Sequence, residues 1–355
     1  MKTYLVGGAV RDKLLRLPVS ERDWVVVGSS EDELLNLGFR PVGRDFPVFL
    51  HPQSNEEYAL ARTELKTGPG HRGFQCRSDP QVTLEEDLSR RDLTINAIAE
   101  TQTGELIDPF GGESDIKTKT LRHVSPAFSE DPLRILRVAR FRARFHHLDF
   151  SVHPETTELI TAMVSNREHE ELTAERVLLE LNKALTTKTP AIFFRYLAEV
   201  GADLALWPEV TPRAIDRLAS CPARDPETRF AVLLSHLHEE EIQQFCKRLK
   251  APKQLQELSI LVSTNIDAWS HLPELDPVAR ARLIEQADGL RKATRFTRFN
   301  LACEEITGLA LAAEWQTVRD TMADVKAEDL NADATGPALG ELLRQERIRR
   351  IGELA

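Results

Sequence analysis

The segment from residue 4 to residue 28 constrains the fold of this chain more than any other. It begins with an apolar strand at Tyr4–Val6, continues through Gly7 and Gly8 into a short helix, and ends in a second strand at Trp24–Gly28. Glycine lets the backbone approach a ligand closely, and the free N–H groups at the start of a helix attract anions. We therefore expect the glycine pair to cradle a phosphate, the alternative being an ordinary strand-to-helix turn.

An acidic pair, Glu21 and Asp23, stands directly before the second strand. Residues two apart share one face of a strand, so both carboxylates are expected to project toward the glycine turn. Adjacent carboxylates repel one another unless a cation separates them, and Mg²⁺ is the usual cation where phosphates are handled. Together, the glycine turn and the acidic pair predict metal-assisted attack on a nucleoside triphosphate. A dinucleotide-binding fold is excluded, because Gly7–Asp12 lacks the spaced glycines of that fingerprint.

Length and composition indicate a soluble globular protein with several domains: 355 residues, 41% apolar and 29% charged. No run of eighteen apolar residues exists, so we expect no membrane-spanning segment. The chain starts in a strand without a signal peptide, and its four cysteines have neither disulfide nor zinc spacing. Reduced thiols and a cytoplasmic location are the simplest expectation.

The net charge of −10 is unevenly distributed. Residues 1–145 hold 21 Lys and Arg against 22 Asp and Glu, whereas the remainder holds 25 against 34. A polynucleotide partner would therefore have to be held by local basic patches rather than by the field of the whole protein.

The pattern of apolar residues predicts an α+β protein, with a mixed sheet and helices in an N-terminal head and an elongated all-helical remainder. Gly68–Gly73 is expected to be a mobile loop and Asp108–Gly112 a turn or hinge. The strands of the head are expected at Tyr4–Val6, Trp24–Gly28, Val48–Leu50 and Tyr58–Ala61. The predicted division is an α/β head (1–125) followed by three helical parts at 126–210, 211–290 and 291–355.

A second motif runs from Asp87 to Ala99 in a stretch that we expect to be helical, with Leu88, Ile95 and Ala99 toward the core. Arg91 offers a planar fork that can grip a phosphate or a ribose. Asp87 lies four residues before it, so a surface ion pair between the two is the alternative interpretation.

A third motif begins at Glu130 and Asp131 and continues as a helix with a stripe of arginines along one side. A solvated helix face usually mixes charges of both signs, so an unpaired cationic stripe is expected to face an anion or base edges. The alternative is a solvated face. The stripe consists of Arg134, Arg137, Arg140 and Arg144.

Taken in order, these motifs resemble those of the bacterial CCA-adding enzymes, tRNA nucleotidyltransferases of the class shared with bacterial poly(A) polymerases. The resemblance covers the whole head and continues into the next helices. It implies a catalytic nucleotidyltransferase head (1–125), a neck of nucleotide-selecting helices (126–210), a helical body that is a degenerate equivalent of the phosphohydrolase region (211–290) and a helical tail (291–355). The matching residues are Leu5–Asp12 with Glu21 and Asp23, Arg90–Asp92 with Asn96, Asp108–Gly112, Glu130–Arg134, and Leu172–Arg176 with Glu180.

The resemblance implies that Glu21 and Asp23 are catalytic and bind Mg²⁺, which activates the tRNA 3′-hydroxyl for in-line attack on the nucleotide α-phosphate. It implies that Gly8 and Arg11 bind the triphosphate and that Arg91 contacts the nucleotide. The implied partners are the 3′ end and acceptor arm of tRNA, with CTP and ATP as substrates. We expect a monomer or a homodimer that has no membrane partner.

Base selection is also implied by the resemblance. Asp131 and Arg134 match residues that read the Watson–Crick edge of the incoming base without a nucleic-acid template, and Arg137 and Arg140 match further ATP/CTP contacts. Glu57 is either a third carboxylate of the site or a solvated strand end.

The chain departs from the family pattern in two places. Glu21 replaces the usual first aspartate of the acidic pair, which moves the charge outward by one methylene; we expect activity to survive. The region around His236 and His238 lacks the His-Asp pair of phosphohydrolase domains, so we expect no such activity there. The two histidines are interpreted as a solvated helix end rather than as a metal cluster.

Three alternatives remain open from the sequence. A poly(A) polymerase shares the head motifs, although the start of the first strand at residue 4 and the neck favour tRNA. An enzyme that adds only CC or only A, and a catalytically weak tRNA-binding protein, are the others. The basic segment Leu342–Ile351 either touches the tRNA backbone or forms a capped surface helix.

Overall fold

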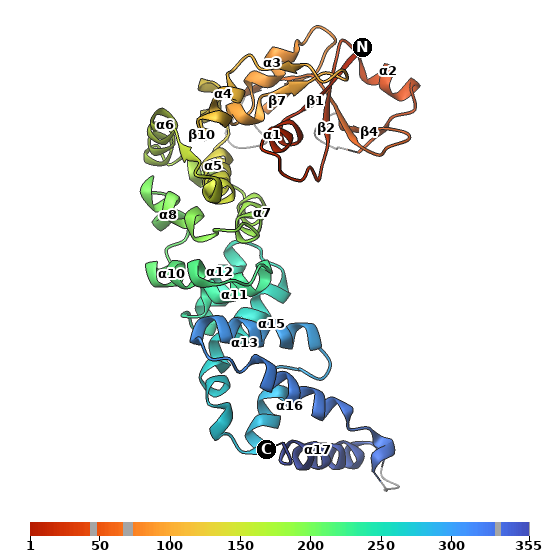
Figure 1. Ribbon diagram of the computed structural model, residues 1–355, viewed down its shortest axis with the longest axis vertical. Coiled ribbons are helices and arrows are strands. Elements are labelled where there is room, and N and C mark those ends of the chain that lie inside the picture. The colour runs from red at the N-terminus through yellow and green to blue at the C-terminus, as the bar shows by residue number, and fades with distance from the viewer. Residues whose placement is uncertain (43–47, 67–73, 331–334, 355) are drawn as a thin grey trace. The chain divides into compact units, whose positions relative to one another are not determined.

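The structure is a computed structural model that describes residues 1–42, 48–66, 74–330 and 335–354 (Figure 1). The chain forms two compact units. The N-terminal unit comprises Met1–Glu180 and Ile192–Leu206, and the C-terminal unit comprises Leu181–Ala191 and Trp207–Ala355. The predicted loop at Gly68–Gly73 lies outside the described residues, which resume at residue 74.

A seven-stranded mixed sheet forms the frame of the N-terminal unit, as predicted. The central strand β2 pairs antiparallel with β1 and parallel with β5, and the other neighbours are antiparallel. In spatial order the strands are β3 (Arg40–Pro41), β4 (Val48–Leu50), β5 (Glu57–Leu60), β2 (Asp23–Val27), β1 (Lys2–Val6), β8 (Ala99–Glu100) and β9 (Leu106–Ile107).

Alternate side chains of the sheet enter two separate apolar clusters, as the two-residue period of a strand requires. Val6 and Val25 pack with Leu88 of helix α3 (Leu84–Ser89) on one face. Val26 and Phe49 pack with Leu34 of helix α2 (Glu31–Asn36) on the other. Both faces of the sheet are therefore covered.

Further helices and two small sheets complete the N-terminal unit (Figure 1, red to green). β6 (Thr63–Lys66) pairs with β7 (Phe74–Arg77), and β10 (Thr120–Leu121) pairs with β11 (Ser151–Val152). The remaining helices are α1 (Gly8–Leu14), α4 (Gly112–Lys117), α5 (Leu133–Phe145), α6 (Pro154–Ser165), most of α7 (Ala174–Leu185) and α8 (Ala191–Glu199), and α9 (Asp203–Leu206).

Two expectations about local structure were wrong. The stretch 87–99 is not one helix: α3 ends at Ser89, a 3₁₀ turn covers Thr94–Asn96, and β8 follows. Tertiary packing outweighs the helix propensity of this stretch. Leu88, Ile95 and Ala99 still reach the core, where they are fully buried. β11 is also a strand inside the region that was expected to be entirely helical.

The C-terminal unit is helical in its described part. Its core holds Trp269 and Trp315, and the indole of Trp315 donates to the backbone oxygen of Trp269 at 2.9 Å. The buried Arg229 donates to the backbone oxygens of Leu185 and Thr187, which ties the end of α7 to this unit. The other helices are α10 (Pro212–Ser220), α11 (Pro226–Leu234), α12 (Glu239–Arg248), α13 (Lys253–Ser270), α14 (Pro277–Gln286), α15 (Ala293–Thr307), α16 (Ala312–Asp324) and α17 (Pro337–Ile351).

Among the described residues, no helix combines the length and the apolar character needed to cross a membrane. Cys221, Cys246 and Cys303 are buried free thiols.

Candidate active site

The register of the sheet brings the glycine turn and the acidic pair to one end of the strands. Val6, the last residue of β1, lies opposite Asp23, the first residue of β2, and Asp23 lies beside Glu57 on β5. Because Gly7 follows Val6 directly, the Asp23 carboxylate lies next to the turn. The strand begins at Asp23, so Glu21 precedes it rather than sharing its face as predicted. The physical reason is that β1 turns away at Gly7 and leaves nothing for Glu21 to pair with.

Gly7 meets two steric requirements at this turn. Its φ of 68° lies in the left-handed region, which side chains strain to adopt. A Cβ atom added there would lie 2.8 Å from Nη1 of Arg91, so the arginine rests directly against the glycine backbone. At Gly8 a Cβ atom would make only an ordinary contact, 3.5 Å from Arg11. The close approach that the sequence predicted for both glycines therefore belongs to Gly7.

Arg91 is held in position by a carboxylate on the preceding helix. Its Nη2 lies 3.1 Å from Asp87, which is fully buried and also binds Arg90 at 2.6 Å. Burial acts to raise the pKa of Asp87, but Arg90 and Arg91 outweigh it and hold the pKa below its usual range. The predicted pair between Asp87 and Arg91 is thus present, with a buried rather than a surface carboxylate. The Nε of Arg91 is buried and has no hydrogen-bond partner within the described structure, which leaves one donor for an anion.

Asp23 has the electrostatics of a cation ligand. Partial desolvation raises its pKa, Arg91 opposes this shift, and the charge of Glu21 adds to it. The two carboxylates therefore repel one another at the turn, and a divalent cation between them would remove that penalty. Over the described residues, no group of three or more His, Cys, Asp or Glu side chains is close enough to hold a metal. Glu21 and Asp23 stay the predicted metal ligands, and Glu57 lies beside Asp23 on the adjacent strand.

Arg11 is an interior residue of the N-terminal unit. Its guanidinium donates to Asp12 at 2.7 Å and to the side-chain oxygen of Asn96 at 2.5 Å. The rings of Phe141 and Phe145 lie 5.2 and 5.1 Å from it. Burial lowers its pKa to about 10. The predicted contact between Arg11 and a triphosphate stays a prediction; in the structure Arg11 connects α1 to α5.

The predicted base-reading pair, Asp131 and Arg134, lies where α5 begins. Asp131 accepts hydrogen bonds from both terminal nitrogens of Arg176 on α7, at 3.1 and 2.8 Å. Burial acts to raise the pKa of Asp131, but Arg176 outweighs it and keeps the carboxylate ionised. Arg134 donates to the backbone oxygens of Ala127 and Arg90. Both side chains are therefore fixed by protein contacts.

The rest of the arginine stripe is paired inside the protein, so the expectation of an unpaired stripe was wrong. Arg137 donates to Asp92 at 2.8 Å, and Arg140 donates to Glu180 at 2.5 Å. Arg144 binds Asp12 at 2.8 Å. The anions that face these arginines are carboxylates of α1, the Arg90–Asp92 motif and α7. These partners could not be predicted from the sequence, because they lie 40 to more than 100 residues away from the arginines along the chain.

Similarity to known proteins extends over nearly the whole chain. Residues 3–122 match the family described as "Poly A polymerase head domain", and residues 149–213 match "Probable RNA and SrmB- binding site of polymerase A". The CCA-adding enzyme of Coxiella burnetii (strain RSA 493 / Nine Mile phase I) is 45% identical over 363 residues, which cover 99% of this chain and 96% of the relative. The chain belongs to the CCA-adding enzyme family.

Further members and solved structures are similar over nearly the same length. The multifunctional CCA protein of Thioalkalivibrio sulfidiphilus is 43% identical, covering 100% of this chain and 98% of the relative. The Bacillus stearothermophilus CCA-adding enzyme in complex with CTP has a TM-score of 0.72 at 25% identity, covering 97% and 87% of the two chains. The Thermotoga maritima CCA-adding enzyme complexed with tRNA has a TM-score of 0.71 at 22% identity, covering 99% and 87%.

Three residues that build this candidate site entered the sequence interpretation only as parts of matching motifs, with no role assigned to them. Asp12 and Glu180 neutralise arginines of the stripe, and Arg176 holds Asp131. One signal was available: Glu180 lies among the apolar residues of α7, and a carboxylate on the buried face of a helix needs a cationic partner.

The histidines and the C-terminal arginines have structural roles. Nε2 of His236 lies 3.0 Å from the backbone oxygen of Glu209, and the backbone N–H of His238 donates to Glu241 at the start of α12. Arg349 and Arg350 of α17 both bind Glu346. These contacts favour the surface-helix interpretation of α17. The expected lack of phosphohydrolase activity stays a prediction.

Proposed function

We propose that this chain is a CTP/ATP:tRNA nucleotidyltransferase that adds and repairs the 3′-terminal CCA of tRNA without a nucleic-acid template. The observation that carries the proposal is the meeting of Gly7, Arg91 and Asp23 at one end of the sheet, in a chain that aligns with CCA-adding enzymes over 99% of its length. Transfer of a nucleotidyl group requires a carboxylate that can hold a cation beside a side chain that can hold an anion, and the nearness of Asp23 and Arg91 supports these proposed roles.

We infer that Glu21 and Asp23 hold Mg²⁺. When bound there, the metal neutralises phosphate charge and activates the attacking 3′-hydroxyl of the tRNA. The mutual repulsion of the two carboxylates supports this assignment. The protein supplies the fixed position of Asp23, set by its pairing with Val6, and the cationic side chain of Arg91 opposite it.

The nucleotide is proposed to lie between the turn and the start of α5. Gly8, Arg11 and Arg91 would serve the triphosphate, and Asp131 and Arg134 would read the base. The bonds from Arg176 to Asp131 support a preformed base site, because fixed polar groups discriminate between partners more sharply than mobile ones. Arg137 and Arg140 remain proposed contacts, although Asp92 and Glu180 already bind them.

Four parts of the chain, 1–125, 126–210, 211–290 and 291–355, remain the proposed functional division. A cytoplasmic location and a monomeric or dimeric state belong to the same proposal.

One assay tests the proposal. Purified protein is given tRNA that lacks CCA, together with labelled CTP alone, ATP alone, or both, with and without Mg²⁺. We expect two C residues from CTP alone and a complete CCA from the mixture. ATP use on any RNA end without CTP incorporation would instead identify a poly(A) polymerase, and a stop after CC or a need for preformed CC would identify a partial enzyme.

A second arm addresses the weak tRNA-binding alternative. Glu21→Ala and Asp23→Ala variants should each lose incorporation by on the order of a hundredfold or more, while tRNA binding persists. Unchanged incorporation in these variants, or no incorporation by the wild type, would support a binding protein instead.

A further inference from the structure

Asp131, the predicted base-reading carboxylate, is gripped by an arginine of α7. The Nη1 and Nη2 atoms of Arg176 donate to its two oxygens at 3.1 and 2.8 Å, in the parallel fork that binds a carboxylate strongly. The side chains of Asp131 and Arg176 are 21% and 22% exposed. The two residues therefore form a directional ion pair that is largely shielded from water but still reachable by a ligand.

The position of Arg176 on α7 indicates that it serves Asp131 rather than its own helix. α7 begins at Ala174, so Arg176 lies in the first turn, where the helix dipole disfavours a cation. Within the described residues, the side-chain hydrogen bonds and the ion pair of Arg176 all go to Asp131. Helix stability alone does not account for an arginine there.

The hydrogen bonds around Asp131 leave room for one further donor. A carboxylate offers about four acceptor positions, two on each oxygen. Its Oδ1 accepts from Arg176 and from the backbone N–H of Leu133, both at 3.1 Å. In the described part of the chain, Oδ2 accepts from Arg176 alone. One position on Oδ2 is therefore open, and as long as the carboxylate is ionised it can only accept a hydrogen bond.

Arg176 is the main group that keeps this carboxylate ionised. Burial acts to raise the pKa of Asp131, and the lowering effects, led by Arg176, outweigh it. Arg134 adds a smaller effect from α5, and Arg137 of the same helix is coupled to Asp131 but also faces Glu180 at 3.8 Å. Without Arg176 the burial would remain and its strongest opponent would be lost. Asp131 would then take up a proton more readily, and a protonated carboxyl can donate a hydrogen bond.

This difference matters because cytosine and uracil have nearly the same shape. Cytosine N4 and adenine N6 carry amino groups that donate hydrogen bonds, whereas O4 of uracil is an acceptor. A side chain that can only accept pairs with the amino group and leaves O4 of uracil facing another acceptor, which weakens binding. A side chain that can donate removes this penalty.

We propose that Arg176 is a specificity-determining residue, which holds Asp131 as an acceptor-only carboxylate so that the site takes bases with an exocyclic amino group and rejects uracil. Arg176 acts through Asp131 and is a positioning residue rather than a catalytic one. The proposal rests on the proposed function, which supplies the nucleotide and the base-reading role of Asp131.

The first experiment replaces Arg176 with methionine, which keeps an apolar stem and removes the fork. The measured quantity is the ratio of kcat/KM for CTP to that for UTP, on tRNA that lacks CCA, between about pH 5.5 and 8.5. The wild type should keep a high and nearly constant ratio. In Arg176→Met we expect the ratio to fall by on the order of tenfold or more at low pH and to recover as pH rises and Asp131 loses its proton.

A merely structural role of Arg176 predicts a different result. Loosening of the site would lower kcat/KM for CTP and UTP together and leave their ratio independent of pH, and this outcome overturns the proposal. Arg176→Lys keeps a cation near Asp131 without the fork, so it should recover most of the wild-type ratio. If lysine restored nothing, the charge of Arg176 would not be the cause.

A second variant supplies the donor permanently. Asp131→Asn carries an amide at every pH, so we expect a low CTP-to-UTP ratio that does not change with pH. Adding Arg176→Met to Asp131→Asn should alter neither the ratio nor its pH profile, because Arg176 acts through the charge of Asp131. A further loss of discrimination in the double variant would show that Arg176 acts by another route.

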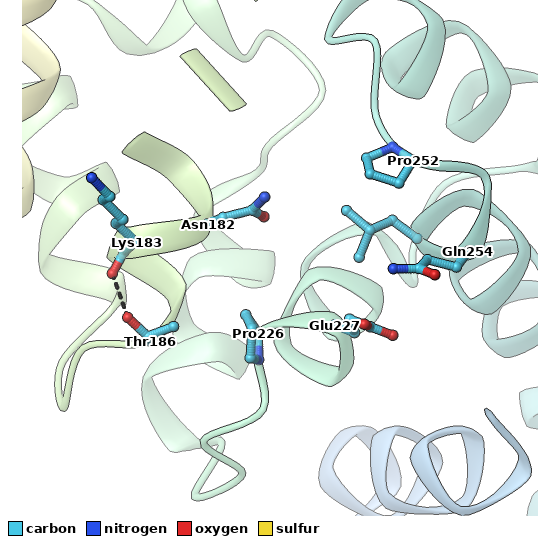
Figure 2. Close-up of a pocket in the computed structure, with 8 residues that line it drawn as sticks. Asn182, Lys183, Thr186, Pro226, Glu227, Pro252 and Gln254 are labelled. Atoms are coloured by element: carbon cyan, nitrogen blue, oxygen red, sulfur yellow. Dashed lines mark hydrogen bonds between the residues drawn. The ribbon is translucent and has the colours of Figure 1, made fainter. Parts of the chain in front are cut away.

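The matched control is Lys183→Met, which removes an exposed cation from the same helix. Figure 2 shows the ammonium group of Lys183 pointing away from the neighbouring side chains, while its backbone oxygen accepts from the hydroxyl of Thr186 at 2.8 Å. Its CTP-to-UTP ratio should equal that of the wild type at every pH. A ratio that fell as in Arg176→Met would mean that any lost charge on α7 suffices.

Equilibrium binding of free CTP and UTP, without tRNA, measures the same preference without catalysis. If the wild type transfers no nucleotide yet prefers CTP in binding, and Arg176→Met loses that preference at low pH, the proposed transfer fails while the role of Arg176 holds. If the wild type builds CCA and the Arg176→Met ratio stays constant, only the role of Arg176 fails. Thermal melts identify folded variants, and Arg176→Lys with Asp131→Asn carries the test if Arg176→Met does not fold.

Discussion

At the residue scale, Gly7 and Asp23 carry the candidate active site for different reasons. Gly7 is required by geometry, since its backbone is left-handed and Arg91 lies against it. Asp23 is the predicted metal ligand, and its pKa is raised by desolvation and by the charge of Glu21. A carboxylate with a raised pKa beside an arginine is typical of a functional site.

Replacing Gly7 with alanine should disrupt the turn. The left-handed conformation costs an L-residue about 1–2 kcal/mol, and the added Cβ would also displace Arg91. We expect Gly7→Ala to lower the free energy of unfolding by at least that amount and to reduce CTP incorporation. Gly340→Ala on α17 is the control, because a Cβ there would meet nothing within 4 Å and its φ is not positive. If both variants behaved alike, the close approach of Arg91 would not matter.

Replacing Asp23 with asparagine should remove activity yet stabilise the fold. The raised pKa means that the folded protein favours the protonated form of Asp23. Protonated Asp23 therefore stabilises the fold fully below the ordinary Asp pKa of about 3.9, and this stabilisation is lost as pH rises through the pKa of the folded state. At pH 7 the ionised Asp23 therefore destabilises the fold, and Asp23→Asn should unfold at higher denaturant than wild type without metal. The two curves should converge below about pH 4. If Asp23→Asn were less stable than the wild type at pH 7, the result would contradict the raised pKa of Asp23.

At the element scale, helices α5 and α7 are joined by buried charge rather than by apolar contact alone. Glu180 of α7 binds Arg137 and Arg140 of α5, while Arg137 also binds Asp92. Arg176, one turn earlier on α7, binds Asp131. α7 therefore fixes both Asp131, the predicted base-reading residue, and the arginines that follow it, which makes this helix a structural support of the predicted nucleotide site.

Neutralising Glu180 should loosen this support. Glu180→Gln leaves Arg140 buried without a full countercharge, and breaking a buried pair typically costs about 3 kcal/mol or more. We expect the free energy of unfolding in urea to fall by roughly that amount and the discrimination between CTP and ATP to weaken. Glu158→Gln on the exposed surface of α6 is the control and should change neither. If Glu180→Gln left the free energy of unfolding unchanged, the ion pairs of Glu180 with Arg137 and Arg140 would contribute little to stability.

At the scale of the whole molecule, the chain passes between its two units more than once. Leu181–Ala191 belong to the C-terminal unit, although residues on both sides of this segment belong to the N-terminal one. Arg229 anchors the segment through Leu185 and Thr187. No single cut of the chain therefore separates the two units cleanly.

A truncation after Leu206 tests this arrangement. The fragment 1–206 keeps Leu181 and Leu185 but loses the helices of their own unit, and each buried leucine contributes about 1.5–3 kcal/mol. We expect the fragment to melt at lower temperature than the full chain and to aggregate in size-exclusion chromatography. A monodisperse fragment that melts like the full chain would show that the N-terminal unit is independent.

The sequence by itself determined the order of the motifs, the mixed sheet and the family, because strand–glycine–helix–acid spacing and apolar periodicity are local properties of the chain. It could not determine which charges meet. The pairs Asp12–Arg144, Asp92–Arg137 and Glu180–Arg140 join residues 40 to 132 positions apart. Only the folded chain brings them together, and pairing follows because a buried charge without a partner is too costly to keep.

The same distinction applies to the segment from residue 4 to residue 28. The sequence placed Glu21 and Asp23 beside a glycine turn, and the strand register confirmed Asp23 there. Tertiary structure alone decided that Gly7 is the glycine pressed by Arg91, that Glu21 precedes the strand, and that the arginine stripe is already paired. Such outcomes depend on which segments the sheet and the helices bring into contact. These contacts cannot be deduced from the spacing of residues along the chain.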